Sequence, residues 1–202
     1  MLTASNSTAV GCASGTAAGI TYNNVSLFGY QAEATGANQV QLGNASTTTY
    51  AYGAVQNRSD ARDKADVRDT VLGLDFINAL RPVDFKWDRR EQYVDVVAEE
   101  VVTVNEDGKE VKTVKYTQVE VPKDGSRKRE RYHHGVIAQE VQAVIEQTGV
   151  DFGGFQDHSL SGGKDVMSIG YEEFIAPLIK AVQELTAQNK ELVDRITALE
   201  AK

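Results

Sequence analysis

Apolar residues in the first 58 positions recur in short blocks that each end at a glycine. The block NVSLFG at residues 24–29 is echoed by NQVQLG at residues 38–43, and NSTAVG at residues 6–11 is a weaker copy. Each block predicts a short strand and a turn of small residues, and one such rung cannot bury its apolar face alone. Rungs must therefore stack, or several chains must wind together. Because each rung holds few large apolar residues, we favour a narrow intertwined trimer; the alternative is a disordered Gly/Ser/Thr linker.

The next apolar stripe predicts a helix followed by a strand. Asp69 suits a helix cap, and four apolar residues at helical spacing come after it: Val71, Leu74, Ile77 and Leu80. We expect this helix over residues 70–80, because Pro82 disfavours helical backbone just before it. Alternation of apolar and polar residues over 83–87 then predicts a strand.

The middle of the chain predicts a hairpin and a second helix. Two Val- and Thr-rich runs over residues 92–121 flank the sequence NEDG at residues 105–108, a strong hairpin signal. Polar residues alternate along both runs, so we expect an arm that leaves the core. A helix is predicted over residues 135–147, followed by a Gly-rich loop over residues 149–164. The apolar face of this helix is expected to hold Ile137, Val141, Val144 and Ile145.

The clearest pattern is a heptad repeat near the C-terminus. It predicts a long helix over residues 172–202 with an apolar seam that joins helices from several chains. The seam comprises Ile175, Leu178, Val182, Leu185, Asn189, Leu192, Ile196 and Leu199. The residues at the a and d positions of the heptad favour a dimer. Rungs that are shared between chains favour a trimer, and we prefer the trimer. The alternative for residues 172–185 is an amphipathic helix packed on its own domain, with Phe174 and Ile179 widening its apolar face.

Composition changes sharply near residue 58 and divides the chain into two modules. Glu33 and Arg58 are the only charged side chains in residues 1–58, whereas residues 59–202 are charged like an ordinary globular domain. We therefore expect an α+β protein. Residues 1–58 would form repetitive β-structure like a triple β-helix, and residues 59–202 an α+β domain that ends in a trimeric coiled coil.

Charge and apolar content argue against several classes of function. The net charge of −8 disfavours a nucleic-acid partner, which requires a basic footprint. The basic run RKRER at residues 127–131 is interpreted as a solvated loop. No apolar run approaches the roughly 20 residues of a membrane helix, and the first residues carry no basic region typical of a signal peptide.

Metal, cofactor and disulfide chemistry find little support in the sequence. Cys12 is the single cysteine, so an intrachain disulfide is excluded. The pairs His133-His134 and Asp157-His158 do not combine into metal-ligand spacing, and we expect no metal or cofactor. The sequence GGKD at residues 162–165 looks like the end of a phosphate loop but lacks its leading glycine and final Ser or Thr.

A serine and a lysine lie five residues apart at the boundary between the modules. Taken alone, the sequence SDARDK at residues 59–64 is ambiguous, since Ser-Asp often forms turns or helix caps. A catalytic pair would need a bend at residues 60–62 to bring Lys64 to Ser59. It would also need an uncharged lysine, and free lysine titrates near ~10.4. Burial or neighbouring cations promote the neutral form, and Arg58 and Arg62 are near in sequence.

Four blocks in the second module, taken in order, resemble the S74 peptidase family, the C-terminal intramolecular chaperones of phage endosialidases and other tailspikes. The blocks are SDARDK at residues 59–64, LRPVDFKW at residues 80–87, HGVIAQEV at residues 134–141, and Tyr171 with IKAVQEL at residues 179–185. The rung blocks are similar to the V-x-L-G repeats of trimeric adhesin heads and phage fibre shafts. The resemblance covers residues 59 to about 185, with the hairpin as a family-variable insertion.

The resemblance implies a homotrimeric chaperone that holds its own N-terminal fibre segment in register and then cleaves the bond between Arg58 and Ser59. Ser59 matches the nucleophile and Lys64 the general base. Further positions that match the family are Asp60, Arg62, His134 and Gln139. Orienting roles are implied for Asp60 and Arg62, whereas a packed or capping role for His134 is equally expected. The implied location is a virion tail fibre or tailspike, with the released chaperone in the host bacterial cytoplasm.

Two alternatives come from other classes of protein. The chain would serve as an uncleaved structural or receptor-binding fibre tip if the coiled coil were a permanent clamp. A third use of the same family releases a membrane-tethered transcription factor, but these residues show neither a DNA-binding module nor a membrane helix.

Overall fold

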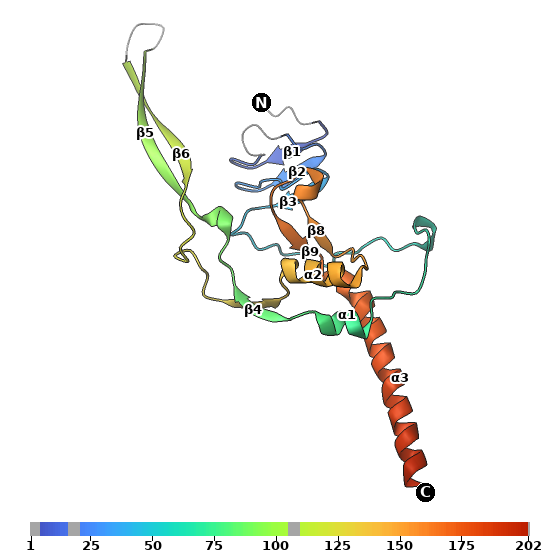
Figure 1. Ribbon diagram of the computed structural model, residues 1–202. Coiled ribbons are helices and arrows are strands. Elements are labelled where there is room, and N and C mark those ends of the chain that lie inside the picture. Colours follow the sequence, from blue (N-terminus) through green and yellow to red (C-terminus); the bar gives the residue numbers. More distant parts are fainter. Residues whose placement is uncertain (1–4, 16–20, 105–109, 202) are drawn as a thin grey trace. The chain divides into compact units, whose positions relative to one another are not determined.

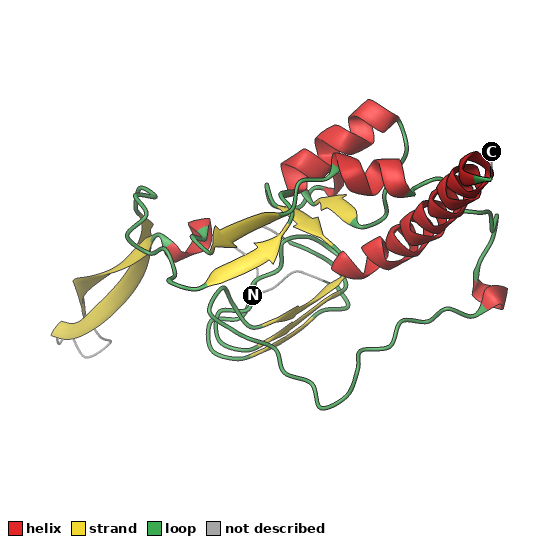
Figure 2. Ribbon diagram, turned by 90° about the horizontal axis from the view of Figure 1, so that it is seen from below, coloured by secondary structure: helices red, strands yellow, loops and turns green. Residues whose placement is uncertain are grey.

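A computed structural model of the chain describes residues 5–15, 21–104 and 110–201 (Figure 1). Contacts divide it into two compact units, one of residues 1–83 with 135–202 and one of residues 84–134. Both strands and helices are present (Figure 2), which confirms the α+β class.

The rungs of the first unit stack within one chain. Strands β1 (Thr8–Val10), β2 (Val25–Phe28) and β3 (Gln39–Leu42) form a parallel sheet in sequence order. The register pairs Val25 with Gln39, so the blocks that repeat in sequence lie on successive rungs. Five residues form a buried cluster inside the rungs: Tyr22, Val25, Leu27, Ala32 and Ala34. Parallel pairing and this buried cluster exclude a disordered linker for residues 21–43.

Asparagine and glycine bracket each rung for a backbone reason. Asn6, Asn24 and Asn38 open the three rungs with φ of 56°, 55° and 57°. Asparagine enters this left-handed region more readily than most residues. The side-chain amide of Asn24 also donates to Asn38 Oδ1 at 2.9 Å, which links successive rungs. Gly29 closes its rung at φ 116°, and a Cβ there would lie 3.1 Å from the Cα of Gly43.

Three aromatic rings form the core of the rest of the first unit. Phe152 lies 5.2 Å from Phe76 and 4.7 Å from Phe174, measured between ring centroids. Val141 and Val144 of α2 (Ala138–Thr148) complete this buried cluster. The rings come from three distant parts of the chain, so this core fixes α1 (Leu74–Ala79), α2 and the start of α3 (Ile175–Glu200) together.

The first helix is shorter than the sequence predicts. The sequence favours a start at Thr70 after an Asp69 cap, but α1 begins at Leu74. The Thr70 hydroxyl instead accepts from the Leu72 amide at 3.1 Å, which forms a local turn. Glu184 of α3 accepts the Leu74 amide at 2.7 Å and so caps the helix from a distant segment. The expected end holds, since Leu80 follows α1 as its C-cap.

The second helix and the loop after it also differ from expectation. Gly135 ends strand β7 (Tyr132–Gly135), so α2 begins at Ala138, and Gly149 ends it in the left-handed region at φ 67°. The Gly-rich segment predicted as a loop contains β8 (Phe155–Asp157). This strand pairs antiparallel with β9 (Met167–Ile169). Strands this short leave almost no periodic signal in the sequence.

The second unit holds the expected hairpin. Strands β5 (Val94–Val104) and β6 (Glu110–Glu120) pair antiparallel, with Val94 opposite Glu120. The predicted turn at residues 105–108 lies outside the described residues. A second pair joins β4 (Val83–Lys86) to β7.

One residue of the basic run is structural, contrary to the expectation of a solvated loop. Arg127 donates to the Val94 carbonyl at 2.8 Å and lies over the Tyr93 ring at 5.6 Å. Tyr93 is buried, and its hydroxyl donates to Asp88 at 2.6 Å. This hydrogen bond holds the pKa of Asp88 below its usual value. Arg127 therefore fixes the base of the hairpin.

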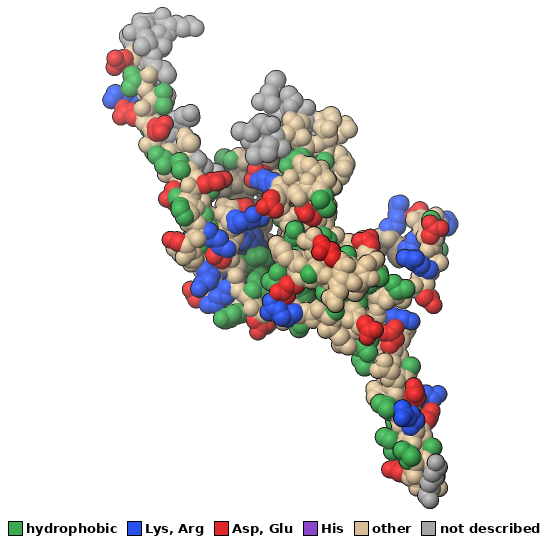
Figure 3. Space-filling view, in the orientation of Figure 1, with side chains coloured by type: hydrophobic (Ala, Val, Ile, Leu, Met, Phe, Trp, Pro, Cys, Tyr) green, Lys and Arg blue, Asp and Glu red, His purple; other side chains and the backbone are tan. Residues whose placement is uncertain are grey.

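Helix α3 has a buried face and a separate exposed face. Phe174, Pro177 and Ala181 are buried along one side. Of the two residues expected to widen this apolar face, Phe174 does so, but Ile179 is exposed. All the apolar seam residues are exposed, as the side chains along α3 in Figure 3 illustrate. Among the helices of the described residues, none combines the length and apolar character that a bilayer span requires.

Gly29→Ala is expected to lower the free energy of unfolding by about 1–3 kcal/mol, because its φ of 116° strains any L-residue. The matched control is Gly15→Ala in the same rung stack, where an added Cβ meets no atom within 4 Å. Denaturant unfolding followed by circular dichroism measures both variants. Equal losses of stability in the two would contradict the backbone explanation.

Candidate functional site

A tight bend lies between Ser59 and Lys64. Residues Ala61–Asp63 form one turn of 3₁₀ helix, with Asp60 as its N-cap. The Asp60 carboxylate accepts from the Arg62 amide at 2.9 Å. The Lys64 amide donates to the Ala61 carbonyl at 3.2 Å, which closes the turn. The bend that a serine–lysine pair requires at this spacing is therefore present.

This bend brings the two candidate catalytic side chains together. Lys64 Nζ donates to Ser59 Oγ at 2.7 Å. That distance lies within the range in which a general base can take a proton from a hydroxyl. Ser59 and Lys64 are exposed, and so is Arg58, the residue that precedes Ser59. An uncharged amine at this position could accept the Ser59 proton, whereas a charged amine can only donate to the hydroxyl.

Asp60 and Arg62 stabilise the bend by pairing with each other. Arg62 Nε donates to Asp60 Oδ1 at 3.0 Å, and Arg62 Nη2 donates to Asp60 Oδ2 at 2.6 Å. This side-chain pair, together with the Arg62 amide, holds the pKa of Asp60 below its usual value. The pair raises the pKa of Arg62 in turn. Both residues therefore pair within the turn, and neither contacts Ser59 or Lys64 among the described interactions.

The cations expected to influence Lys64 are both paired with carboxylates. Arg62 faces Asp60, and Arg58 Nε lies 3.7 Å from Asp63 Oδ2. Each guanidinium therefore sits against a negative charge, which weakens its field at the lysine. The sequence-based idea that these arginines favour a neutral Lys64 gains no support from this arrangement.

The other two family-matched positions lie elsewhere in the chain. His134 belongs to the second unit, where its Nδ1 lies 2.6 Å from Asp84 Oδ1 between two exposed side chains. Gln139 is exposed in the first turn of α2. Its neighbour Glu140 forms an ion pair with Arg81. The described contacts place neither His134 nor Gln139 in the network around Ser59.

An exposed connecting segment leads from the rungs to the bend. Residues 48–58, called the connecting segment below, contain no helix or strand and are exposed throughout. Asn57 near its end donates to Glu172, a contact that sequence reasoning does not anticipate. The bond between Arg58 and Ser59 therefore lies in a solvent-exposed part of the chain.

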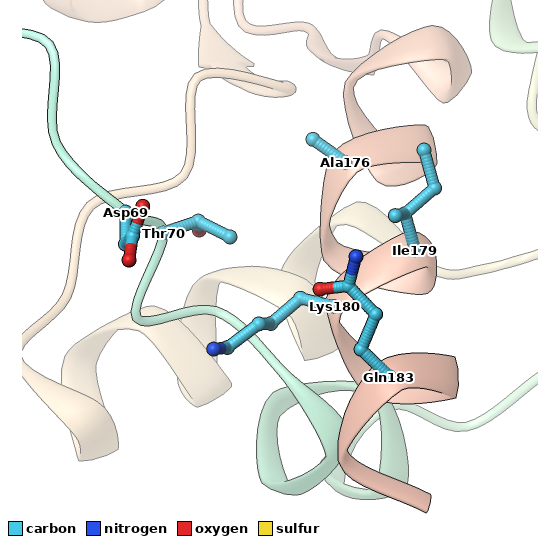
Figure 4. A pocket seen from close by; sticks show the side chains of 6 residues that line it. All are labelled: Asp69, Thr70, Ala176, Ile179, Lys180 and Gln183. Atoms are coloured by element: carbon cyan, nitrogen blue, oxygen red, sulfur yellow. The ribbon is translucent and has the colours of Figure 1, made fainter. Parts of the chain in front are cut away.

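A hollow beside α3 does not include the serine–lysine pair. It lies between the segment before α1 and the first turns of α3 (Figure 4). Its lining residues are Asp69, Thr70, Ala176, Ile179, Lys180 and Gln183. Among residues 5–15, 21–104 and 110–201, no group of three or more His, Cys, Asp or Glu side chains is arranged to hold a metal ion.

The pairing of Asp60 with Arg62 predicts how the bend responds to acid. Because the pKa of Asp60 is lowered, its contribution to the bend is complete above the ordinary value of 3.8 and is lost as the pH falls below it. In the Ser59→Ala chain, the amide NMR signal of Arg62 should stay constant from pH 7 to about 4. It should then shift with a midpoint below 3.8. A midpoint at or above that value would contradict the pairing.

Comparison with known proteins supports the first part of the sequence resemblance. The model of the Peptidase_S74 family, described as chaperone of endosialidase, matches residues 59–112. The match begins at Ser59 and includes the bend, α1, β4 and the first strand of the hairpin. The later blocks at residues 134–141 and 171–185 lie outside it. No curated protein matches the chain. The motif at the bend and the family match agree, and residues 59–112 of this chain are therefore similar to the Peptidase_S74 family.

Proposed function

We propose that residues 59–202 are an assembly chaperone for the repetitive β-segment before them, and that the chain then cuts itself between Arg58 and Ser59. The observation that carries the proposal is the 2.7 Å distance between Lys64 Nζ and Ser59 Oγ. The family match supports it, because the match begins at the residue that would become the new N-terminus.

The chemistry follows from the order of the residues. A neutral Lys64 takes the proton from Ser59 Oγ, and the oxygen attacks the carbonyl carbon of Arg58. A C–O bond forms, the C–N bond of the peptide breaks, and the Ser59 nitrogen receives the proton from Lys64. Water then hydrolyses the resulting ester, which frees the Arg58 carboxylate and restores the hydroxyl. The attacking group is permanently next to its substrate, so one slow turnover suffices.

A homotrimer is supported by two apolar surfaces that one chain leaves open. The first is the exposed seam of α3. The second lies on the rungs, where the register aligns Val10 with Phe28 and Phe28 with Leu42. These three side chains are 56%, 43% and 50% exposed and form a continuous apolar column. Large exposed apolar surfaces of this kind mark interaction sites, and copies of the same chain would cover both.

A separately folding trimeric domain would solve the register problem of the rungs. Repetitive strands pair easily in the wrong register, and contacts between chains form slowly. Joining the chains first through α3 would remove that obstacle. Removing the chaperone afterwards would leave a fibre that cannot be realigned once unfolded, and so a kinetically trapped product. We place the fibre in a phage tail and the released chaperone in the host cytoplasm.

One observation favours the alternative of an uncleaved, permanently clamped fibre tip. A lysine base is usually made neutral by burial or by neighbouring cations, and Lys64 is exposed beside paired arginines. In that case the exposed seam of α3 would be a lasting clamp, and the short Ser59–Lys64 contact would serve only to hold the bend.

Cleavage provides the direct test. Purified chain should yield a fragment of residues 59–202 on a denaturing gel. Ser59→Ala removes the attacking oxygen and should abolish the fragment, and Lys64→Met should slow its appearance by roughly 100-fold or more, the usual worth of a positioned base. Ser161→Ala and Lys190→Met are matched controls, since both positions are exposed and distant in sequence. Intact-mass measurement identifies the cut. Wild-type chain that stays whole would favour the clamped fibre tip.

The seam provides a second test, independent of cleavage. Leu192→Asp places a carboxylate in the seam and should convert the trimer into monomers at micromolar concentration, because burying an unpaired charge is costly. Ala187→Asp adds the same group to the opposite side of α3 and should leave the trimer intact. Sedimentation equilibrium measures both variants. A wild-type dimer would mean that the a and d residues of the seam, rather than the shared rungs, set the number of chains, and a monomer would refute the assembly.

A further inference from the structure

The loop between β8 and β9 contacts the rung stack through backbone and charge. We call residues 158–165 the latch loop. The Lys164 amide donates to the Thr35 carbonyl at 2.7 Å. Lys164 Nζ lies 2.7 Å from Glu33 Oε2. Glu33 is one of only two charged side chains in the first 58 residues, so the single acidic group of the rungs is used in this contact.

The backbones of the two segments approach so closely that only glycine fits at position 163. A Cβ at Gly163 would lie 2.4 Å from the Thr35 carbonyl oxygen and 2.7 Å from the His158 carbonyl oxygen. On the rung side, a Cβ at Gly36 would be in ordinary contact with the Cα of Gly163, at 3.8 Å. Gly163, one of the two glycines that resemble a phosphate loop in the sequence, therefore has a different use, which is to let the latch loop reach the rung.

A chain of hydrogen bonds fixes the side chains at this contact. The Thr35 amide donates to Gln39 Oε1 at 2.9 Å, and the Thr35 hydroxyl donates to the same oxygen at 3.1 Å. Because that hydroxyl proton is used, Thr35 Oγ1 accepts from His158 Nδ1 at 3.3 Å. The other ring nitrogen, His158 Nε2, lies 3.0 Å from Ser168 Oγ. The contact thus requires a rung that is already folded, with Gln39 of β3 in place.

The first rung and the latch loop contact neighbouring parts of the same segment. Gly15 of the first rung bridges to Glu33, and its amide donates to the Ala32 carbonyl at 3.0 Å. Thr35 lies three residues beyond Ala32, in a bend, and its carbonyl accepts from the Lys164 amide. Lys164 thereby covers a backbone acceptor that would otherwise be free to pair with another chain.

We propose that the latch loop is the docking site by which the chaperone recognises a folded rung of its own shaft, residues 32–36. The proposal rests on the proposed function for the identity of the client. It goes beyond it in one respect: the latch is non-covalent and includes neither Arg58 nor Ser59. A cut between Arg58 and Ser59 therefore leaves the chaperone bound, and its release is a separate step.

The test separates docking from self-cleavage. In the Ser59→Ala chain, a recognition site for an added sequence-specific protease replaces residues 50–55, which are exposed. After that protease has cut, gel filtration should show both pieces eluting together. Glu33→Lys or Lys164→Glu should speed their separation by about tenfold, because like charges then face each other. The double reversal Glu33→Lys with Lys164→Glu should restore the rate to within about twofold.

A second pair of variants tests the close approach. Gly163→Ala should also speed separation, whereas Gly153→Ala should not, since its added Cβ meets nothing nearer than 3.8 Å. Immediate separation of the parent pieces would overturn the proposal, as would single reversals without effect or a double reversal that fails to recover. Since the added protease makes the cut, none of these results depends on whether Ser59 cleaves the chain.

Discussion

Each parallel rung in this chain buries one apolar face and leaves other apolar side chains exposed to solvent. The rest of the structure depends on this constraint. Val25 and Leu27 turn into the rung stack, but Phe28 and Leu42 alternate to the outside and remain exposed. Successive side chains of a strand point to opposite faces, so a strand that packs one face inside the stack turns the other face outward. Helix α3 also leaves apolar surface exposed. The face that packs on its own core is narrow, and the apolar seam beside that face is exposed. Apolar surface left open at both places is the physical reason to expect several chains to fold together.

The sequence predicts those elements whose signals are local or periodic. The rungs are evident because Asn38 and its equivalents occupy backbone conformations that few residues adopt, so the repeat is visible in composition. The hairpin and α3 are long enough to carry their own period. The start of α1 could not be predicted, because its cap is Glu184, far away along the chain. Strands β8 and β9 escape prediction because three residues carry no pattern, and only pairing defines them.

The same distinction between local signals and long-range contacts applies to the candidate site. The bend between Ser59 and Lys64 is encoded locally, by an aspartate at the cap position and an arginine two residues later that pairs with it. The sequence therefore suffices to anticipate the bend, while the catalytic interpretation depends on the family resemblance. His134 shows the limit of that resemblance, since its partner is Asp84 across a strand pair. The latch loop could not be found from sequence, because Gly163 is required only once the rung that it contacts is folded.

The connecting segment would give the proposed cut after Arg58 a thermodynamic consequence. Eleven extended residues reach at most about 40 Å, so before cleavage the latch loop and its rung face each other at an effective concentration in the millimolar range, as for short flexible tethers. After cleavage the same contacts face the true concentration of the two pieces. The tether would then help to hold the latch closed during assembly, and only the contacts of the latch itself would hold it afterwards. Breaking one peptide bond would thus change the molecularity of the contact without altering any atom within it.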